Sequence, residues 1–237
     1  VLVVGGGVTG CEAAWALARS GVRTLLVTTS LDTVYNLYGD VAELTPPDGS
    51  LMASAVAQAR KVGGAGSAVE SEGGAATSVS SWALHTQVKA ALESAPALHL
   101  LQSSVSGLKV TNGDVIGVST WEGVDRYAHK VALCVGAFLS AQLRIGSSVE
   151  AAGRLSEMAY DDLYHDLVGH GFQFERHERA APRLEGSLPY QVEFQTFAAS
   201  ERPIHHTSPD TEYGNAAAAL ARKVASLRSF FKYLVNK

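Results

Sequence analysis

The sequence has little that would cross-link the chain or anchor it in a membrane. Its 237 residues include two cysteines, too few for a disulfide framework, and such usage is typical of a reducing compartment. No apolar run approaches the roughly 18 residues that a membrane-spanning helix needs. Val1–Val4 has no basic flank and runs straight into glycines, so it is not a signal peptide. We expect a soluble, cytoplasmic protein with no membrane contact. Because there is no initiator Met, we also expect the chain to be trimmed upstream.

Charge is also sparse. Charged residues make up 18% of the chain and the formal net charge is -4, which argues against a dedicated nucleic-acid binder. The hydrophobic fraction of 46% is enough to build a core and excludes wholesale disorder. No internal repeat is visible, and the length fits one large domain. We predict a single domain over residues 1–237.

Glycine, in contrast, is abundant, and the first glycines follow an apolar segment. Val1–Val4 precedes Gly5-Gly6-Gly7-Val8-Thr9-Gly10, and helical spacing then continues to Ser20. Gly21 ends that helix, and Thr24–Thr28 reads as a second buried strand. A strand, a glycine turn, a helix and a parallel strand within about thirty residues form a βαβ unit.

The glycine spacing in this unit predicts a dinucleotide site. In the pattern GxGxxG, Gly5 permits a tight turn and Gly7 lets a pyrophosphate approach the backbone. Gly10 lets the helix pack on the strand, and the amides at the helix N-terminus then face the phosphates. The pattern alone is weak, but here the whole βαβ context accompanies it. The alternative is a purely structural glycine turn. The predicted cofactor-binding residues of the turn are Gly5, Gly6, Gly7, Val8, Thr9 and Gly10.

The end of the second strand does not decide which dinucleotide binds. An acidic residue usually receives the ribose hydroxyls there. This sequence has Thr28-Thr29-Ser30 instead, with Asp32 slightly later. Hydroxyl groups also hydrogen-bond a ribose, so Thr28, Thr29 and Ser30 are predicted cofactor contacts, with FAD and NAD both open at this point.

Between residues 34 and 81 the sequence is hard to read. Thr45–Ser50 carries a loop signal, and Val62–Ser81 is rich in Gly, Ala and Ser, which predicts a mobile loop over about 62–81. Helical spacing returns over Trp82–Leu92.

The following segments favour FAD. Short alternating segments flank Asn112-Gly113, a strong hairpin signal, where a β-meander would lie. A buried strand over Val131–Val135 then ends at Gly136, as flavoprotein domains of this type commonly have. Helical patterns follow over Asp161–His170 and near the C-terminus. We therefore predict an α/β fold, a Rossmann-type FAD-binding domain with a parallel sheet, helices on both faces and a small β-meander.

The sequence also resembles the GidA/MnmG family. The resemblance rests on the glycine turn continued by Cys11-Glu12-Ala13-Ala14, and on Leu31-Asp32-Thr33 after the second strand. It is clearest over Ala132–Leu139 and resumes in the segments Arg144-Ile145-Gly146, Gly153-Arg154 and Pro182–Gly186. It covers most of residues 1–186, with a poor patch at about 34–81.

The resemblance implies an FAD-dependent enzyme of the kind that installs a carboxymethylaminomethyl group on the wobble uridine of tRNA. It implies FAD contacts from the glycine turn, from Thr28–Ser30, from the backbone of Val105 beside the adenine and from the turn at Gly136. Tyr160 aligns with a serine that contacts the flavin in the family. Asp210–Ala216 faintly resembles the family's final flavin-contacting turn.

This sequence also departs from the family pattern. The family has a Ser-Cys-Asn-Pro segment with a cysteine thought to be catalytic, whereas Tyr35–Leu44 contains no cysteine. We expect the chain to lack the family's NAD-binding and tRNA-binding domains, so tRNA binding by this chain alone is not expected.

Other candidate residues are weaker. Cys11 lies in the first helical turn, where amide dipoles lower the pKa of a thiol. We nevertheless interpret it as a small residue that packs on the sheet rather than as a reactive thiol. Cys134 lies in an apolar strand. His205 and His206 are adjacent, point to opposite faces of an extended chain and have no supporting ligand cluster, so no metal site is predicted. The basic residues of the closing helix are predicted to form a solvent-exposed face.

The sequence therefore predicts an FAD-binding flavoprotein, an FAD-dependent oxidoreductase related to GidA/MnmG, with no catalytic residue assigned. The alternative is a non-catalytic flavin-binding module that acts through a partner protein.

Overall fold

A computed structural model describes residues 1–37, 41–62, 68–70, 77–135, 139–145, 147–152, 159–180 and 196–203 of the chain. They divide into two units. Unit 1 contains the described residues of Val1–Gln102 together with Ala132–Cys134, and unit 2 contains those of Ser103–Val131 and Val135–Ser208.

The centre of unit 1 is a four-stranded sheet in the order β10-β1-β2-β6. Its strands are β1 (Leu2–Val4), β2 (Thr24–Thr28), β6 (Leu98–Gln102) and β10 (Val131–Leu133). β1 pairs parallel with β2, and β2 pairs parallel with β6. Leu2, Val3 and Val4 are all buried, as expected for a central strand covered on both faces.

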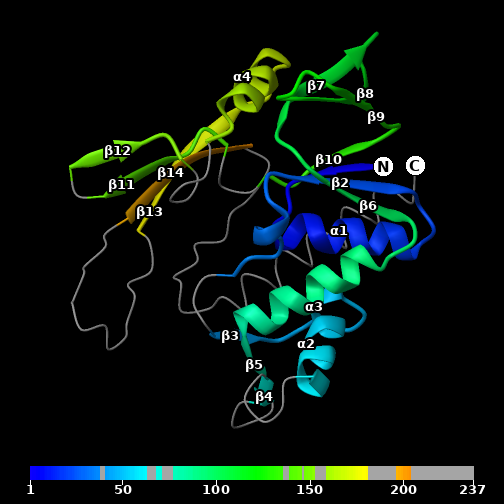
Figure 1. The fold of residues 1–237 in the computed structure, drawn as a ribbon. Coiled ribbons are helices and arrows are strands. Elements are labelled where there is room, and N and C mark those ends of the chain that lie inside the picture. The colour runs from blue at the N-terminus through cyan, green and yellow to red at the C-terminus, as the bar shows by residue number, and fades with distance from the viewer. Residues whose placement is uncertain are drawn as a thin grey trace. The chain divides into compact units, whose positions relative to one another are not determined.

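Three helices of unit 1 pack beside this sheet: α1 (Val8–Arg19), α2 (Leu51–Val62) and α3 (Ser81–Glu93). They lie on one side of the sheet (Figure 1) and share one hydrophobic core with it. α1 ends before Gly21, whose φ of 79° is left-handed, so the predicted stop is confirmed. α3 confirms the predicted helix and begins after Ser80, whose side chain accepts a hydrogen bond from the Ala83 amide.

Residues 34–81, which were hard to assign from the sequence, include a second, smaller sheet and α2. Strands β3 (Val41–Leu44), β5 (Thr77–Ser80) and β4 (Ala68–Glu70) form an antiparallel sheet in the order β3-β5-β4. The predicted loop over 62–81 is therefore wrong at Thr77–Ser80 and at Ala68–Glu70. Val79 is buried in the common core, a tertiary contact that the glycine-rich composition did not reveal.

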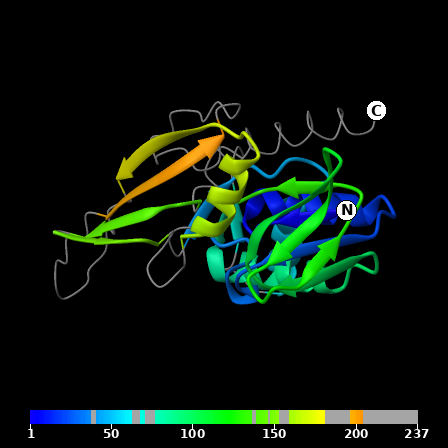
Figure 2. The same cartoon turned by 90° about the horizontal axis from the view of Figure 1, so that it is seen from above.

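Unit 2 begins with a three-stranded antiparallel meander, β7-β8-β9. Its strands are β7 (Val105–Thr111), β8 (Asp114–Thr120) and β9 (Asp125–Tyr127), visible as green arrows in Figure 2. Asn112 and Gly113 join β7 to β8 with φ of 54° and 87°. Two consecutive positive φ angles define the tight hairpin turn that the Asn-Gly pair predicts.

The remainder of unit 2, in its described residues, contains one helix and four strands. α4 (Asp161–Gly169) ends before Gly171, which has a φ of 88°. Strands β11 (Gln142–Ile145), β12 (Ser148–Glu150), β13 (Phe174–Ala180) and β14 (Thr196–Pro203) form an antiparallel sheet in the order β12-β11-β14-β13. α4 is tied to β7 because the Asp166 carboxylate accepts a 2.7 Å hydrogen bond from the Leu108 amide.

The predicted α/β class is confirmed by the parallel sheet, its helices and the meander. In unit 1 the described helices lie on one face of the sheet rather than on both (Figure 1). The single-domain prediction stays a prediction. Among the described residues, no helix has the length and apolar character to cross a bilayer.

Candidate functional site

The glycine turn lies at the carboxyl end of β1, where the chain reverses into α1. Gly5 has a φ of 105°, a conformation that favours glycine, and its amide donates a 2.8 Å hydrogen bond to the carbonyl of Val27 in β2. The turn is thereby held against the neighbouring strand, and α1 starts directly beside the sheet.

Two glycines of the turn are required by close packing. A Cβ on Gly10 would collide with the carbonyl oxygen of Gly5, and a Cβ on Gly6 would collide with the side chain of Thr28. Gly7 differs, because a Cβ there would have no neighbour within 4 Å. The space beside Gly7 is therefore open to a ligand, while Gly6 and Gly10 bring backbone and strand together.

The N-terminus of α1 has a charge distribution that favours an anion. Gly7 is its N-cap and provides no side-chain hydrogen bond, and the first turn contains no acidic residue. The first amides of a helix have no intrahelical acceptor, and the helix dipole adds partial positive charge there. Val8 and Thr9 are partly exposed in this turn. The arrangement is suited to a phosphate group.

The segment after β2 lies beside this turn. Thr28 is buried against Gly6, and its hydroxyl donates a 3.3 Å hydrogen bond to the carbonyl of Ser30. Thr29 is exposed. The Ser30 hydroxyl accepts a hydrogen bond from the Asp32 amide and caps η1 (Leu31–Thr33). The structure thus brings the predicted turn and Thr28–Ser30 together.

The Asp32 carboxylate lies 3.2 Å from the Lys89 ammonium. Its side chain is 90% exposed, so the ion pair contributes little to stability. This carboxylate comes after the position at which an acidic residue usually meets a ribose.

Sequence reasoning missed Glu12, a buried carboxylate on α1. Its side chain is only 6% exposed. One oxygen accepts hydrogen bonds from the Tyr35 hydroxyl at 2.6 Å and the Met52 amide at 2.9 Å, and the other accepts from the Leu51 amide at 2.9 Å. The signal in the sequence was the single acidic residue of α1, which lies between Cys11 and Ala13.

Tyr35 occupies the start of the segment where the resemblance placed a catalytic cysteine. It is 1% exposed, and burial, with the neighbouring Glu12 carboxylate, holds the pKa of its phenol well above the ordinary value. Its backbone adopts a φ of 56°, unusual for a bulky residue. This side chain is a buried hydrogen-bond donor.

Neither cysteine has the features of a nucleophile. Cys11 is fully buried, its Sγ donates to the Gly6 carbonyl at 3.1 Å, and burial raises the pKa of the thiol. Burial also raises the pKa of Cys134 to about 12. The packing interpretation of Cys11 is supported by its burial and by its hydrogen bond to Gly6.

In unit 2, Val105 and Tyr160 line one pocket of about 280 Å³. Val105 is buried at the start of β7, and Tyr160 precedes α4 with a φ of 50°. Trp121, Asp161 and Asp162 are among the other lining residues. These two predicted cofactor residues are thus brought together, within unit 2.

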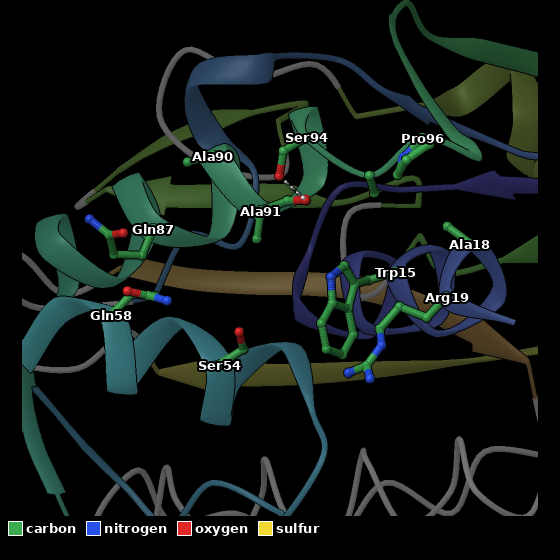
Figure 3. A pocket seen from close by; sticks show the side chains of 11 residues that line it. Trp15, Ala18, Arg19, Ser54, Gln58, Gln87, Ala90, Ala91, Ser94 and Pro96 are labelled. Atoms are coloured by element: carbon green, nitrogen blue, oxygen red, sulfur yellow. Dashed lines mark hydrogen bonds between the residues drawn. The ribbon is translucent and has the colours of Figure 1, made fainter. Parts of the chain in front are cut away.

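A larger cavity of unit 1 lies away from the glycine turn. Its volume is about 560 Å³, and it lies between the C-terminal half of α1, α2 and α3 (Figure 3). The Arg19 guanidinium carbon lies 4.6 Å from the centre of the Trp15 ring. This cavity contains none of the predicted cofactor residues.

Some predicted positions lie outside the described residues: Gly136, the turn at Asp210–Ala216, the pair His205 and His206, and the closing helix. In the part of the chain that the structure describes, no group of His, Cys, Asp and Glu is suited to hold a metal ion.

The parallel sheet, the glycine turn and the uncapped N-terminus of α1 define a Rossmann-type α/β protein. The profile of the family named Glucose inhibited division protein A, GidA, matches residues 1–203. The chain belongs to the GidA family.

Similar proteins agree with this assignment. The tRNA uridine 5-carboxymethylaminomethyl modification enzyme MnmG of Chlamydia trachomatis serovar A is 30% identical over 215 residues, covering 81% of this chain and 34% of that protein. The chain thus spans about a third of the length of the curated relatives it matches.

Solved structures show the same fold. The GidA-related protein from Thermus thermophilus is 35% identical with a TM-score of 0.63, covering 85% of this chain and 76% of that one. A crystal form of Aquifex aeolicus GidA has a TM-score of 0.65 at 24% identity, covering 77% of this chain and 32% of that one.

Proposed function

We propose that this chain binds FAD and belongs to an FAD-dependent oxidoreductase. Membership of the GidA family supports a flavin cofactor. The observation that carries the proposal is the open, uncapped N-terminus of α1 beside Gly7. The pyrophosphate of FAD would accept hydrogen bonds from the first amides of this helix.

The other predicted residues have roles consistent with the rest of the cofactor. Thr29 and Ser30 carry hydroxyl groups beside the turn and would bind the ribose, while the buried Thr28 would support the turn by packing on Gly6. Val105 would meet the adenine through its backbone, and Tyr160 would contact the cofactor from the same pocket. Gly136 is proposed from the resemblance alone. When bound, the isoalloxazine ring supplies the electron transfer, and the chain binds and orients it.

The test is the cofactor itself. The full chain is purified without added flavin, its visible absorption is recorded, and the released compound is identified by chromatography and mass spectrometry. The flavin-free protein is then titrated with FAD and, separately, with NAD. We expect the flavin spectrum and preferential FAD binding. A colourless protein that binds NAD but not FAD would refute the proposal.

A second function is favoured by the chemistry of the two cysteines. The sequence contains no others, and burial raises the pKa of both thiols. Thiol chemistry of the kind that the resemblance implies is therefore not supplied by this chain. A flavin-binding module that acts through a partner protein fits this observation.

The rate of flavin reduction by NADH or NADPH in the isolated chain separates the two functions, since a module without turnover stays oxidised. The tRNA uridine modification that gives the Chlamydia relative its name is tested by mass spectrometry of tRNA nucleosides after gene deletion. An unchanged wobble uridine profile would exclude it.

A further inference from the structure

We propose that Glu12 is a positioning residue for the cofactor turn: acting through Tyr35, its buried carboxylate fixes the peptide that follows Gly6 and so aims the Gly7 amide. This inference rests on the proposed FAD site and adds a residue that does not itself touch the cofactor.

The Glu12 carboxylate is a junction between three segments. It lies on α1, binds the side chain of Tyr35 after η1, and binds the amides of Leu51 and Met52 at the start of α2. A buried carboxylate is stable only when hydrogen bonds replace its hydration, and each of these donors does so. Tyr35 and the start of α2 are thereby fastened to α1.

The link from this junction to the cofactor turn is the backbone of Tyr35. The Tyr35 amide donates a 2.7 Å hydrogen bond to the carbonyl of Gly6. Val34 lies against the same glycine, since a Cβ on Gly6 would lie 3.3 Å from its Cγ1 atom. The Cys11 thiol donates to the same carbonyl at 3.1 Å. The Gly6 carbonyl therefore has a fixed direction.

A fixed Gly6 carbonyl also fixes the next amide. In a trans peptide the C=O and the following N–H point in opposite directions within one plane. Because the Gly6 oxygen faces the Tyr35 amide, the Gly7 N–H points away from Tyr35. This amide belongs to the exposed N-cap residue of α1, at which the pyrophosphate is proposed to bind.

The conformation of Tyr35 shows why an anchor is needed. A φ of 56° is unfavourable for a residue with a large side chain, so the position is held by its surroundings. Glu12 holds the phenol at one end of the residue, and Gly6 holds the amide at the other. Loss of the carboxylate releases the side chain, and the backbone relaxes away from the strained φ angle.

The experiment uses Glu12→Gln, Tyr35→Phe and the double variant in the full chain. Val88→Ala, in the buried core on α3, is the control for loss of stability. The first readout is the amide resonance of Gly7 in flavin-free protein, followed by NMR. We expect it to shift in Glu12→Gln and Tyr35→Phe and to stay in place in Val88→Ala.

The second readout is the FAD dissociation constant, measured well below every melting temperature. We expect Glu12→Gln to weaken FAD binding by about tenfold or more, the scale of a hydrogen bond to a charged group. Tyr35→Phe should have a smaller effect in the same direction. The double variant should bind FAD as tightly as Glu12→Gln does, because the Tyr35 hydroxyl acts only through the Glu12 carboxylate. Val88→Ala should bind FAD within about twofold of the parent.

The outcomes separate this inference from the proposed function. Normal FAD binding and an unmoved Gly7 resonance in both single variants would overturn the role of Glu12 and leave the FAD site standing. A parent protein that binds no FAD would refute the proposed function, and the Gly7 resonance would still decide whether Glu12 aims this amide.

Discussion

A carboxylate placed at Gly7 should weaken FAD binding by roughly a hundredfold without harming the fold. Gly7 has φ of -71° and ψ of 179°, extended angles that any residue adopts, and a Cβ there meets no atom within 4 Å. Gly7→Asp therefore introduces no strain. Because Asp is a preferred N-cap residue, it should leave the free energy of unfolding unchanged or raise it by about 0.3–1 kcal/mol.

The same carboxylate would face the proposed pyrophosphate. Two unit charges about 6 Å apart at an effective dielectric constant of about 20 repel by about 3 kcal/mol. This corresponds to roughly a hundredfold weaker binding. Gly7→Asn is the matched control, since Asn has nearly the same size and capping ability but no charge. The difference in FAD affinity between the two variants measures the electrostatic effect.

The assay is a titration of flavin-free protein with FAD, followed by flavin fluorescence, together with thermal unfolding of both variants. The difference in FAD affinity between Gly7→Asp and Gly7→Asn should decrease at high ionic strength, because salt screens exposed charges. If both variants still bind FAD measurably and with equal affinity, no phosphate lies at the N-terminus of α1, and the reasoning would fail.

Three further predictions concern stability and reactivity. The Ser119 hydroxyl and the Lys109 ammonium hold the pKa of Asp125 below its ordinary value, so its stabilisation is present above the unfolded pKa and is lost as the pH falls through the lower folded pKa. In urea unfolding at pH 7, Asp125→Asn should therefore have a lower free energy of unfolding than the parent. This difference should disappear at acidic pH. A difference that is the same at both pH values would contradict the reasoning. Because burial raises its pKa, Cys11 should react with a thiol reagent in a Cys134→Ala background only after denaturation, and rapid native labelling would show that the thiol is accessible. Ser50→Ala removes the hydroxyl that accepts from the Ala53 amide at 3.0 Å and should lower the free energy of unfolding by about 1 kcal/mol, whereas an unchanged urea midpoint would show that this hydroxyl does not stabilise α2.

The elements predicted well are those with a local cause. Gly5 lies in the turn before α1 and Gly21 lies just past its end, and each adopts a positive φ. The Asn112-Gly113 pair, also with positive φ, produces a hairpin turn. These signals depend on the backbone preferences of single residues, so the sequence is sufficient to recognise them.

The elements missed are those that depend on distant partners. α2 has buried apolar residues, but its start is set by the Glu12 carboxylate, 39 residues before Leu51. β5 forms because it pairs with β3 and β4 and buries Val79 in the core. Composition favours a loop there, and tertiary pairing overrides it.

The candidate site divides in the same way. The glycine turn follows from spacing, whereas Glu12 and Tyr35 do not, because no local rule predicts that a helix carboxylate meets a phenol 23 positions later. For Val105 and Tyr160, the sequence offered only a family resemblance. The structure adds that both line one pocket.

The hydrogen bond between Asp166 and the Leu108 amide has a consequence for folding. It joins residues 58 positions apart and lies between two irregularities in the pairing of β7 with β8. Gly107 makes room for it, since a Cβ there would lie 2.9 Å from the Asp166 carboxyl carbon. The β7–β8 hairpin has a local turn and is expected to form early, whereas the contact of α4 with β7 joins residues far apart in the chain and is expected to form later.

The Leu108 amide is then a single-site reporter of that late event. Its hydrogen exchange should slow only when α4 has docked, while neighbouring amides in the hairpin gain protection earlier. A pulse-labelling experiment on this one amide would resolve the order in which unit 2 assembles.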